Sequence, residues 1–440
     1  MRTITEESVE IIGEPAKLLV VGGGYVGLPT AGVLARFGHY VTLAERDPQR
    51  LQSLQDGKSP HIERDLEELL QEGMSQGKLK FVLDAAAVAH KAEVVFICVP
   101  TPQSDDGTTD LSYLLEAVKS VGPKLRRGAI LVIKSTVPVG TAALVLKVID
   151  RPDISIVSNP EFLSTGTAVA ESLNPERIVV GAKDRNVAEK IASLFGKTRA
   201  PVVITSNETA ETIKYAANAF LAIRLSFSNE VSRFCEKVGA NVIDLLQGLG
   251  HDHRIGFSYL QPGPGWGGSC LPKDTASLIM MGRANGFKFS VLESAVSTNN
   301  AQLDHVVNTI VSIFQESPNR NVALWGLTFK SGTDDRRHSP AIHVARRLLD
   351  LGFNVKAYDP TVVSGNADDL DGIDIVGDPY SAAKDTSLVV LLTDWPEFRE
   401  LDWEKVSSVM KSPFIYDTRN GLDGATIKNS SLRYRSVGTI

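Results

Sequence analysis

The sequence predicts an α/β protein in which two parallel-sheet domains flank a helical segment. Three observations lead to this fold class. A glycine-rich loop lies between a strand-like and a helix-like stretch near the N-terminus, strand and helix signals alternate through the first 205 residues, and the alternation returns after residue 318. We therefore divide the 440 residues into 1–205, 206–317 and 318–440.

The glycine-rich loop has both the pattern and the context of a dinucleotide fingerprint. The apolar run Leu18–Val21 precedes the hexapeptide Gly22–Gly27, which reads GGGYVG, and the helix-compatible run Leu28–Phe37 follows it. In such a loop the first glycine makes a tight turn, the second admits the pyrophosphate and the third lets the helix pack on the strand. The phosphates then lie at the helix N-terminus. The residues expected to contact the cofactor here are Gly22, Gly24, Tyr25, Val26 and Gly27.

An acidic residue after the second strand indicates which cofactor the loop binds. The strand-like run Tyr40–Ala44 ends at Glu45, about 20 residues beyond the fingerprint, where a carboxylate binds the ribose hydroxyls. The neighbouring Arg46 weakens this preference slightly. We therefore expect NAD as the cofactor, in preference to its 2′-phosphorylated form.

The rest of the first domain alternates between strand and helix signals, which favours a mostly parallel sheet. Polar loops follow three of the expected strands, at Pro100–Pro102, Ser135–Pro138 and Asn159–Phe162. Because ligands of open α/β sheets bind outside the carboxyl ends of the strands, we expect these loops to face the cofactor. The expected strands are Val94–Val99, Ile130–Lys134, Ile154–Ser158 and Arg177–Gly181, and the expected helices are Asp65–Glu72, Leu111–Gly122 and Thr141–Ile149.

The middle of the chain is predicted to be helical. Between Glu208 and Leu249, apolar residues recur at three- and four-residue spacing. Lys214 and Asn218 lie in this stretch and share one helix face because they are four residues apart. Further helices are expected at Leu278–Gly286 and Val291–Ser317.

A short linker and a second α/β domain complete the predicted organisation. Ser317–Arg320 has the composition of a linker. The two α/β domains resemble a loose internal duplication and not a short-period repeat. The strands expected after the linker are Val322–Gly326, Asn354–Tyr358, Leu388–Leu392 and Phe414–Asp417.

One cysteine has the surroundings of a nucleophile. Cys270 lies in the decapeptide Gly265–Asp274, GWGGSCLPKD, whose glycines let backbone and ligand approach closely. A neighbouring cation, Lys273, favours the nucleophilic thiolate. Asp274 opposes that effect, although its carboxylate can orient a water or an oxyanion. The other two cysteines, which are predicted to be small buried hydrophobes, are Cys98 and Cys235.

Composition excludes several classes of protein. The chain is 43% hydrophobic and 22% charged, as globular proteins are, and its net charge of −6 offers no footprint for nucleic acid. No apolar run approaches the ~20 residues of a membrane span. No His/Cys cluster has metal-ligand spacing, so no metal is expected. Because Met1–Glu14 is unlike a signal peptide and three cysteines make no disulfide framework, we expect a cytoplasmic protein.

Ordered motifs along the chain resemble the UDP-glucose/GDP-mannose dehydrogenase family. The resemblance runs from Leu18 to about Gly421. It implies a Rossmann-like NAD domain, a central helical dimerisation segment and a C-terminal Rossmann-like nucleotide-sugar domain, so that the chain would form a homodimer or a higher homo-oligomer. The motifs are GGGYVGLPTA, CVPTPQ, KSTVPVGT, NPEFL, ETIKYAANAFLAIRLSFSNE, RIG, GWGGSCLPKD, GLTFKSGTDDRR and YDTRNG.

The resemblance implies a four-electron oxidation of a nucleotide-sugar C6 alcohol to the carboxylate, with UDP-glucose as the expected substrate. An aldehyde has no hydride to give until a nucleophile adds to it. Cys270 would therefore form a thiohemiacetal, whose oxidation yields a thioester that water hydrolyses. By the same resemblance, the other catalytic residues are Lys214 and Asn218, which stabilise oxyanions, Asp274 and Thr136, which hold a water, and Glu161, the general base for hydrolysis.

Further ligand contacts follow from the same resemblance. Phe162 and Leu163 would offer main-chain contacts to the sugar, and Tyr259 would lie against the base. Arg254 would come from the partner subunit. The implied substrate contacts are Phe162, Leu163, Lys214, Asn218, Arg254, Tyr259, Gly267, Lys330 and Arg419, and the further cofactor contacts are Thr101, Thr136 and Arg337.

Some residues depart from the family pattern. Thr165 stands where many relatives carry a carboxylate, so the water network or the nicotinamide end is arranged differently. The stretches 251–253 and 261–264 also depart, and they border the nucleotide and sugar pockets. A TDP- or GDP-linked hexose is therefore an alternative substrate. Ser269 argues against the N-acetylhexosamine branch, which tends to have histidine before the cysteine.

Two alternatives come from other functional classes. A two-electron dehydrogenase of the 3-hydroxyacid type shares the N-terminal and helical plan but does not need Cys270. A non-catalytic protein that binds NAD or a nucleotide sugar would bind its ligand without turnover. The presence of every expected catalytic side chain, apart from the carboxylate at position 165, disfavours this second alternative.

Overall fold

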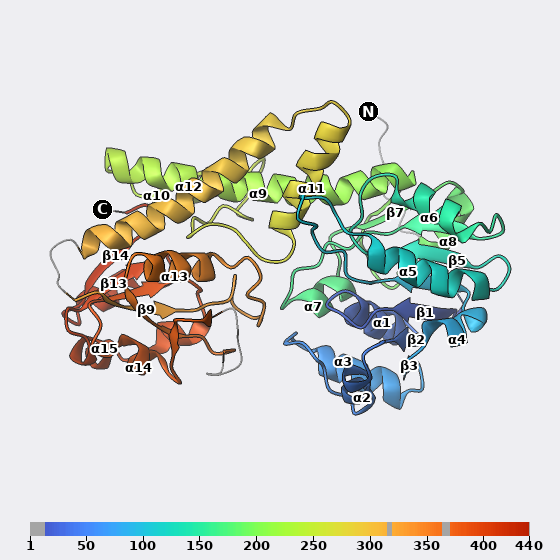
Figure 1. The fold of residues 1–440 in the computed structure, drawn as a ribbon, viewed down its shortest axis with the longest axis horizontal. Helices are drawn as coiled ribbons and strands as arrows, with labels where there is room; N and C mark the ends of the chain where they lie inside the picture. The colour runs from blue at the N-terminus through green and yellow to red at the C-terminus, as the bar shows by residue number, and fades with distance from the viewer. Residues whose placement is uncertain (1–13, 315–318, 363–369, 440) are drawn as a thin grey trace. The chain divides into compact units, whose positions relative to one another are not determined.

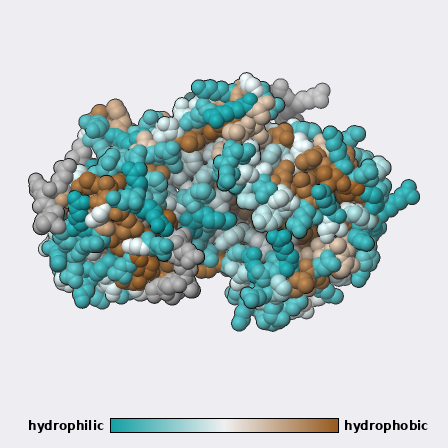
Figure 2. Space-filling view, viewed as in Figure 1, coloured by the Kyte–Doolittle hydropathy of each residue, from teal (hydrophilic) through white to brown (hydrophobic). Residues whose placement is uncertain are grey.

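The computed structural model describes residues 14–314, 319–362 and 370–439. Nearly all of the polar N-terminal segment lies outside these ranges, as do the first two residues of the expected linker. Within these ranges, no helix is long and apolar enough to cross a membrane. Apolar side chains on the drawn face form patches with polar residues between them (Figure 2).

The chain divides into two compact units, Met1–Ala217 and Asn218–Ile440. The boundary falls inside the longest helix, α9 (Asn207–Val238), which therefore begins in the first unit and continues into the second. The division of the chain into three domains stays a prediction.

An eight-stranded sheet organises the first unit, in the order β3-β2-β1-β4-β5-β6-β7-β8. Every neighbouring pair is parallel except β6 and β7, which are antiparallel. The predicted mostly parallel sheet is confirmed, and β3 and β8 are edge strands that the sequence analysis missed. The bounds are β1 (Lys17–Val21), β2 (Tyr40–Ala44), β3 (Leu79–Val82), β4 (Val94–Ile97), β5 (Ile130–Ile133), β6 (Ser155–Ser158), β7 (Ile178–Ala182) and β8 (Val202–Thr205).

Helices cover both faces of this sheet because side chains of a strand alternate between its faces. Leu18 and Val20 of β1 pack into one apolar core with α1, α3 and α8, whereas Leu19 and Val21 pack into the other with α5 and α6. The helices are α1 (Gly27–Arg36), α2 (Pro48–Gln55), α3 (Leu66–Ser75), α4 (Ala85–Val88), α5 (Ser112–Val121), α6 (Thr141–Ile149), α7 (Ala168–Leu173) and α8 (Arg185–Ser193).

The stretch Glu208–Leu249 is helical, as predicted, but it is divided. Two helices occupy the stretch, α9 and then α10 (Val242–Gly250). Gly239 interrupts them with a φ of +76°, a conformation that glycine adopts without strain. Asn241 then caps α10, since its side chain accepts hydrogen bonds from the backbone N–H groups of the first turn.

The helix expected from Leu278 begins earlier, at Leu271. This helix, α11 (Leu271–Ala284), starts immediately after Cys270. The reason is Pro272, because proline is favoured in the first turn of a helix, where its missing N–H has no partner to lose. Gly286, with a φ of +68°, follows its end. The next helix is α12 (Ser290–Ile313), slightly shorter than the expected Val291–Ser317 at its C-terminal end.

A second, fully parallel sheet lies in the Asn218–Ile440 unit, in the order β11-β10-β9-β12-β13-β14. Figure 1 shows α13 on one side of these strands and α14 and α15 on the other. The bounds are β9 (Asn321–Trp325), β10 (Asn354–Tyr358), β11 (Asp374–Ile375), β12 (Leu388–Leu391), β13 (Phe414–Asp417), β14 (Arg433–Ser436), α13 (Pro340–Asp350), α14 (Pro379–Ala383), α15 (Trp403–Val409) and α16 (Gly424–Lys428).

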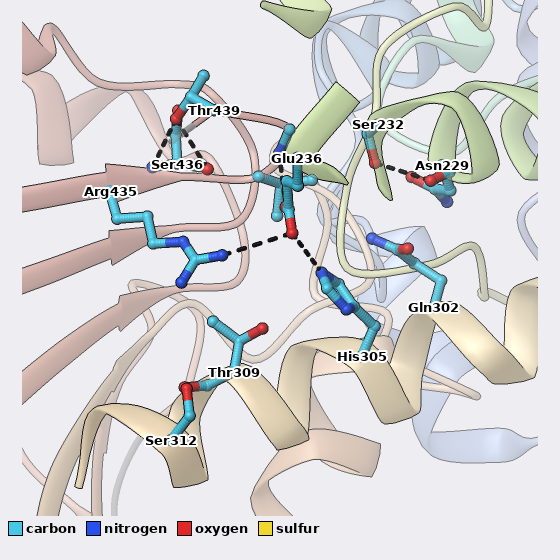
Figure 3. Close-up of polar contacts among 12 residues, drawn as sticks. Asn229, Ser232, Glu236, Gln302, His305, Thr309, Ser312, Arg435, Ser436 and Thr439 are labelled. Atoms are coloured by element: carbon cyan, nitrogen blue, oxygen red, sulfur yellow. Dashed lines mark hydrogen bonds and ion pairs between the residues drawn. The ribbon is translucent and has the colours of Figure 1, made fainter. Parts of the chain in front are cut away.

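A buried carboxylate joins the central helices to this sheet. Glu236 of α9 forms ion pairs with His305 of α12 at 3.0 Å and with Arg435 of β14 at 3.4 Å (Figure 3). Its Oε1 accepts the backbone N–H of Gly438 at 2.9 Å. Burial acts to raise the pKa of Glu236, but these donors outweigh it and hold the pKa below its usual range. The contacts explain why α12 and β14 belong to one compact unit.

Candidate active site

The glycine-rich loop has the shape that a pyrophosphate requires. Gly22 has a φ of +106°, and a Cβ there would lie 2.6 Å from the carbonyl oxygen of Cys98. A Cβ on Gly27 would lie 1.8 Å from the carbonyl oxygen of Gly22. By contrast, a Cβ on Gly24 would meet nothing within 4 Å. The two outer glycines therefore close the turn, and the middle one leaves room for a ligand at the start of α1.

The acidic residue after β2 points back at this loop. The buried Glu45 accepts the backbone N–H of Gly23 on Oε2 at 3.2 Å and that of Asp47 on Oε1 at 3.0 Å. Arg46 is directed to Glu116, with an ion pair of 3.4 Å. The carboxylate is thus held beside the loop, as ribose binding requires, and the residues present fit NAD.

Three predicted site residues follow three neighbouring parallel strands. Thr101 follows β4, Thr136 follows β5 and Glu161 follows β6, and all three are buried. Because these strands pair in parallel, the three residues leave the sheet at the same edge. The structure therefore brings the predicted polar loops to the carboxyl ends of the strands, where ligands of such sheets bind.

Glu161 and Lys214 form a buried ion pair. Lys214 Nζ lies 2.9 Å from Glu161 Oε1, and only 4% and 7% of the two side chains are exposed. Glu161 Oε2 accepts the backbone N–H of Leu163 at 2.6 Å. Burial acts to raise the pKa of Glu161, but Lys214, this N–H and Lys134 hold it below its usual range. Glu161 is therefore ionised at neutral pH, as a base must be before it accepts a proton.

Lys134 belongs to this group, and the sequence analysis missed it. It is buried at the end of β5, and its Nζ donates to Asn159 Oδ1 at 3.2 Å. Burial lowers the pKa of Lys134, while Glu161 acts in the opposite direction. A lone lysine at the end of the apolar run Ile130–Ile133 was the available signal. Two lysines around one carboxylate leave an excess of positive charge that suits a developing oxyanion.

A second group of predicted residues surrounds Asp274 in the Asn218–Ile440 unit. Asp274 is 1% exposed and accepts the side-chain amide of Asn218 at 2.6 Å. Its other oxygen lies 2.5 Å from Lys273 Nζ. Cys270 is half-buried and immediately precedes α11. Lys273 is therefore paired with Asp274, so this carboxylate offsets part of the positive charge that was expected to act on the thiol.

The glycines before Cys270 are required by close packing. A Cβ on Gly267 would lie 2.0 Å from the carbonyl oxygen of His338, and one on Gly268 would lie 2.8 Å from the ring of Phe329. Trp266 is buried and donates through its ring N–H to Ser226 at 2.9 Å. Trp266 is thus a packing residue.

The predicted contacts from the C-terminal part lie partly together. Arg419 follows β13 and donates to the carbonyl oxygens of Leu392 at 2.7 Å and Phe329 at 3.0 Å. Burial lowers the pKa of Arg419. Lys330 is next to Phe329 in the chain, and its Nζ lies 5.7 Å from that ring. Arg337 lies in the same β9–α13 loop, paired with Asp335 at 2.7 Å.

Two predicted substrate contacts lie in the stretch after α10. The side chain of Arg254 is 78% exposed and pairs with Asp252 at 2.5 Å. Tyr259 is 39% exposed and has a φ of +59°. Within the described residues, no group of three or more His, Cys, Asp or Glu side chains has the arrangement of a metal site.

Comparisons with known proteins agree along most of the chain. Three family models match: the NAD binding domain at 16–199, the central domain at 208–301 and the UDP binding domain at 323–424, all of the UDP-glucose/GDP-mannose dehydrogenase family. UDP-glucose 6-dehydrogenase TuaD of Bacillus subtilis is 37% identical, with 96% of this chain and 93% of that protein aligned.

Solved structures give the same result. A UDP-glucose dehydrogenase from Pyrobaculum islandicum superposes with a TM-score of 0.88 at 32% identity, covering 97% of this chain and 98% of that one. A UDP-D-ManNAc dehydrogenase from Pyrococcus horikoshii gives 0.85 at 27% identity, covering 96% and 99%. From these matches and the fit of the glycine-rich loop, the chain belongs to the UDP-glucose/GDP-mannose dehydrogenase family, with NAD as its cofactor.

Proposed function

We propose that the protein oxidises the C6 alcohol of UDP-glucose to the carboxylate and so forms UDP-glucuronate. The observation that supports this most directly is the half-buried Cys270 at the start of α11, with the buried Asp274 one turn further on. A thiol in that setting is what the second oxidation needs. The UDP-glucose 6-dehydrogenases at 34–37% identity support UDP-glucose as the substrate.

The reaction proceeds in three chemical stages. NAD, when bound, supplies the hydride acceptor for each of two oxidations. After the alcohol has become an aldehyde, the sulfur of Cys270 adds to its carbon and the carbonyl oxygen takes up a proton. The thiohemiacetal then loses a hydride and a proton to become a thioester. Water attacks that carbon, the C–S bond breaks, and the acid and the thiol are released.

The buried charged residues act in the stages in which negative charge develops on an oxygen atom of the substrate. Lys214, with Asn218, stabilises the oxyanion formed when sulfur or water adds to the carbonyl carbon. Glu161 accepts the proton of the attacking water, aided by Thr136 and Asp274, which hold that water. Because Glu161 is paired with Lys214 at 2.9 Å, the same lysine restrains its basicity until the oxyanion competes for the ammonium.

The ligands are held by the remaining predicted residues. Main-chain groups of Phe162 and Leu163 contact the sugar, and Tyr259 and Gly267 line the nucleotide. Lys330 and Arg419 neutralise the diphosphate, for which arginine offers a bidentate donor pair. Thr101 and Arg337 complete the cofactor contacts.

We also propose that the protein is a homodimer that pairs through α9. Arg254 of each subunit would then contribute to the substrate site of the other. Three phenylalanines spaced seven residues apart share one face of this helix and are largely exposed. They are Phe220 at 60%, Phe227 at 48% and Phe234 at 62% exposure.

The functional division is that of the sequence analysis: 1–205 for NAD, 206–317 for dimerisation and the catalytic cysteine, and 318–440 for the nucleotide sugar. We place the reaction in the cytoplasm, since no disulfide joins the three cysteines.

A substrate panel tests this proposal. The protein is incubated with NAD⁺ and, separately, UDP-glucose, TDP-glucose, GDP-mannose and UDP-N-acetylmannosamine, and NADH and sugar acid are both counted. We expect the highest kcat/KM with UDP-glucose and about two NADH per acid, without free aldehyde. One NADH per product with released aldehyde would instead identify a two-electron dehydrogenase. Ligand binding without NADH would identify a non-catalytic binding protein.

A further inference from the structure

The segment between α2 and α3, residues 57–65, lies against the glycine-rich loop. The ring of His61 stacks on that of Tyr25, with centroids 4.0 Å apart and planes at 25°. Arg50 Nη2 lies 2.8 Å from His61 Nε2. Because arginine has donors and no acceptor, Nε2 is the acceptor in this hydrogen bond. We call residues 57–65 the linking segment.

The other end of the linking segment holds a different loop. Glu63 is buried, and each of its oxygens accepts one backbone N–H, from Gly166 at 2.6 Å and from Ala168 at 2.8 Å. These N–H groups belong to residues 161–168, the loop that begins with Glu161 and leads into α7. The linking segment therefore contacts both the cofactor loop and the loop that carries the proposed general base.

Carboxylates define the backbone of the 161–168 loop. Glu161 accepts from Leu163 at 2.6 Å, and Glu171 of α7 accepts from Ser164 at 2.5 Å. Glu63 supplies the remaining two of these contacts from a distant part of the sequence. Hydrogen bonds to a carboxylate are stronger than those between neutral groups. A change in the position of the Glu63 side chain should therefore move the loop with it.

We propose that the linking segment couples cofactor binding to the loop that carries Glu161. A dinucleotide on the glycine-rich loop fixes Tyr25, the stacked ring fixes His61, and Glu63, two residues on, fixes the backbone at Gly166 and Ala168. His61 and Glu63 are thus positioning residues. The inference rests on the proposed roles of Tyr25 and Glu161, and it goes beyond them because it makes cofactor occupancy a condition for an ordered base loop.

Thermodynamic linkage sets what must be observed. If the cofactor stabilises the ordered loop, the ordered loop stabilises bound cofactor by the same factor. Amide hydrogen exchange measures the loop side of this relation, because local opening limits exchange. Fluorescence of bound NADH measures the cofactor side.

The experiment follows exchange in peptides covering residues 162–170, with and without saturating NADH. In the wild-type protein we expect NADH to slow exchange at Gly166 and Ala168 by about fivefold or more. In His61→Ala, NADH still binds at high concentration, but this slowing is lost. His61→Phe keeps the stacked ring without the hydrogen bond from Arg50, and we expect it to restore the slowing.

Glu171→Gln is the matched control. It removes another carboxylate that accepts a backbone N–H of the 161–168 loop. Glu171 lies on α7, however, and not on the linking segment. We expect faster exchange at Ser164 in this variant, while the NADH-induced slowing at Gly166 and Ala168 persists. Glu63→Gln should lose that slowing, its Kd for NADH should rise by the same factor, and its kcat should fall several-fold.

The results decide the proposal in either direction. Slowing that persists in folded His61→Ala at saturating NADH would overturn it, as would the absence of any slowing in the wild-type protein. If His61→Ala unfolds, His61→Phe and Glu63→Gln carry the test. Exchange needs only NADH binding, so it decides the coupling even if the count of NADH per acid contradicts the proposed function.

Discussion

Two buried carboxylates, Glu161 and Glu236, have similar partners and different surroundings. Each has two nitrogen-bearing partner side chains and accepts a backbone N–H, and in each case donors hold its pKa below the usual range despite burial. The cations of Glu161 are both sealed from water: Lys214 is 4% exposed and Lys134 is buried. The partners of Glu236 reach the surface, with His305 26% and Arg435 33% exposed.

This difference separates two uses of buried charge. Glu236 joins α9, α12 and the chain after β14, so its hydrogen bonds are satisfied by permanent neighbours. Glu161 lies on a loop at the end of a strand, where the positive charge of two lysines exceeds its own. A carboxylate that only connects segments does not need that excess, whereas one beside a developing oxyanion gains from it.

The largest effect is expected from Glu161→Gln. The change keeps the shape of the side chain but removes the base, so kcat should fall by about 100- to 10,000-fold. Because the thiol is retained, the thioester should accumulate and appear as an added mass on the peptide that contains Cys270. The companion variant Cys270→Ser should show no adduct. An unimpaired steady-state rate in Glu161→Gln, without adduct, would remove Glu161 from the mechanism.

Glu236→Gln provides the opposite half of the comparison. It leaves His305 and Arg435 beside a neutral amide, and we expect it to lower the free energy of unfolding by about 1–3 kcal/mol. Turnover per folded molecule should not change. Urea denaturation and kcat are the two measurements, and a large loss of kcat with intact stability would show that Glu236 also serves the reaction.

Lys134→Met tests whether the second lysine sets the proton affinity of Glu161. Since Lys134 lowers the pKa of Glu161, its removal should raise that pKa. Hydrolysis needs the ionised carboxylate, so the acid limb of the kcat–pH profile should move to higher pH. The smaller charge excess should also weaken oxyanion stabilisation and lower the plateau. An unshifted acid limb would assign that limb to another group.

The smallest effect concerns pH and stability. Glu236 has a lowered pKa in the folded protein, so its contribution to stability is complete above the pKa of the unfolded chain and is lost as pH falls through the folded value. The difference in Tm between the wild-type protein and Glu236→Gln should therefore be greatest near neutral pH and should disappear at acidic pH. A difference that grows on acidification would reverse the assigned sign.

Contiguous patterns made much of the fold predictable. The strand, glycine-rich loop and helix from Lys17 to Arg36 form from neighbouring residues, so the sequence indicates them directly. The break between α9 and α10 depends on a single left-handed glycine, Gly239, inside an otherwise helical pattern. The start of α11 depends on the two roles of proline, which restricts a turn but also favours a first helical turn.

The contacts within the candidate site were less accessible to sequence reasoning. The types of residue at Glu161 and Lys214 indicated chemistry, but their direct pairing joins positions 53 apart and requires the sheet to form first. The two N–H groups that Glu63 binds lie more than 100 residues away. Such contacts depend on topology, and no local periodicity encodes them. The family motifs indicated which residues matter but not which of them touch.

The unequal burial of the three cysteines has a consequence for oxidative damage. Cys98 and Cys235 are closed off, and burial raises the pKa of Cys98 to about 12, so its sulfur stays protonated and inert. Of the three cysteines, Cys270 alone is partly exposed, and hydrogen peroxide is smaller than any sugar. Oxidation to the sulfenic acid would therefore begin at the sulfur that we propose as the nucleophile. Peroxide would therefore abolish the activity of the protein long before it unfolds the chain, and a thiol reductant would restore that activity.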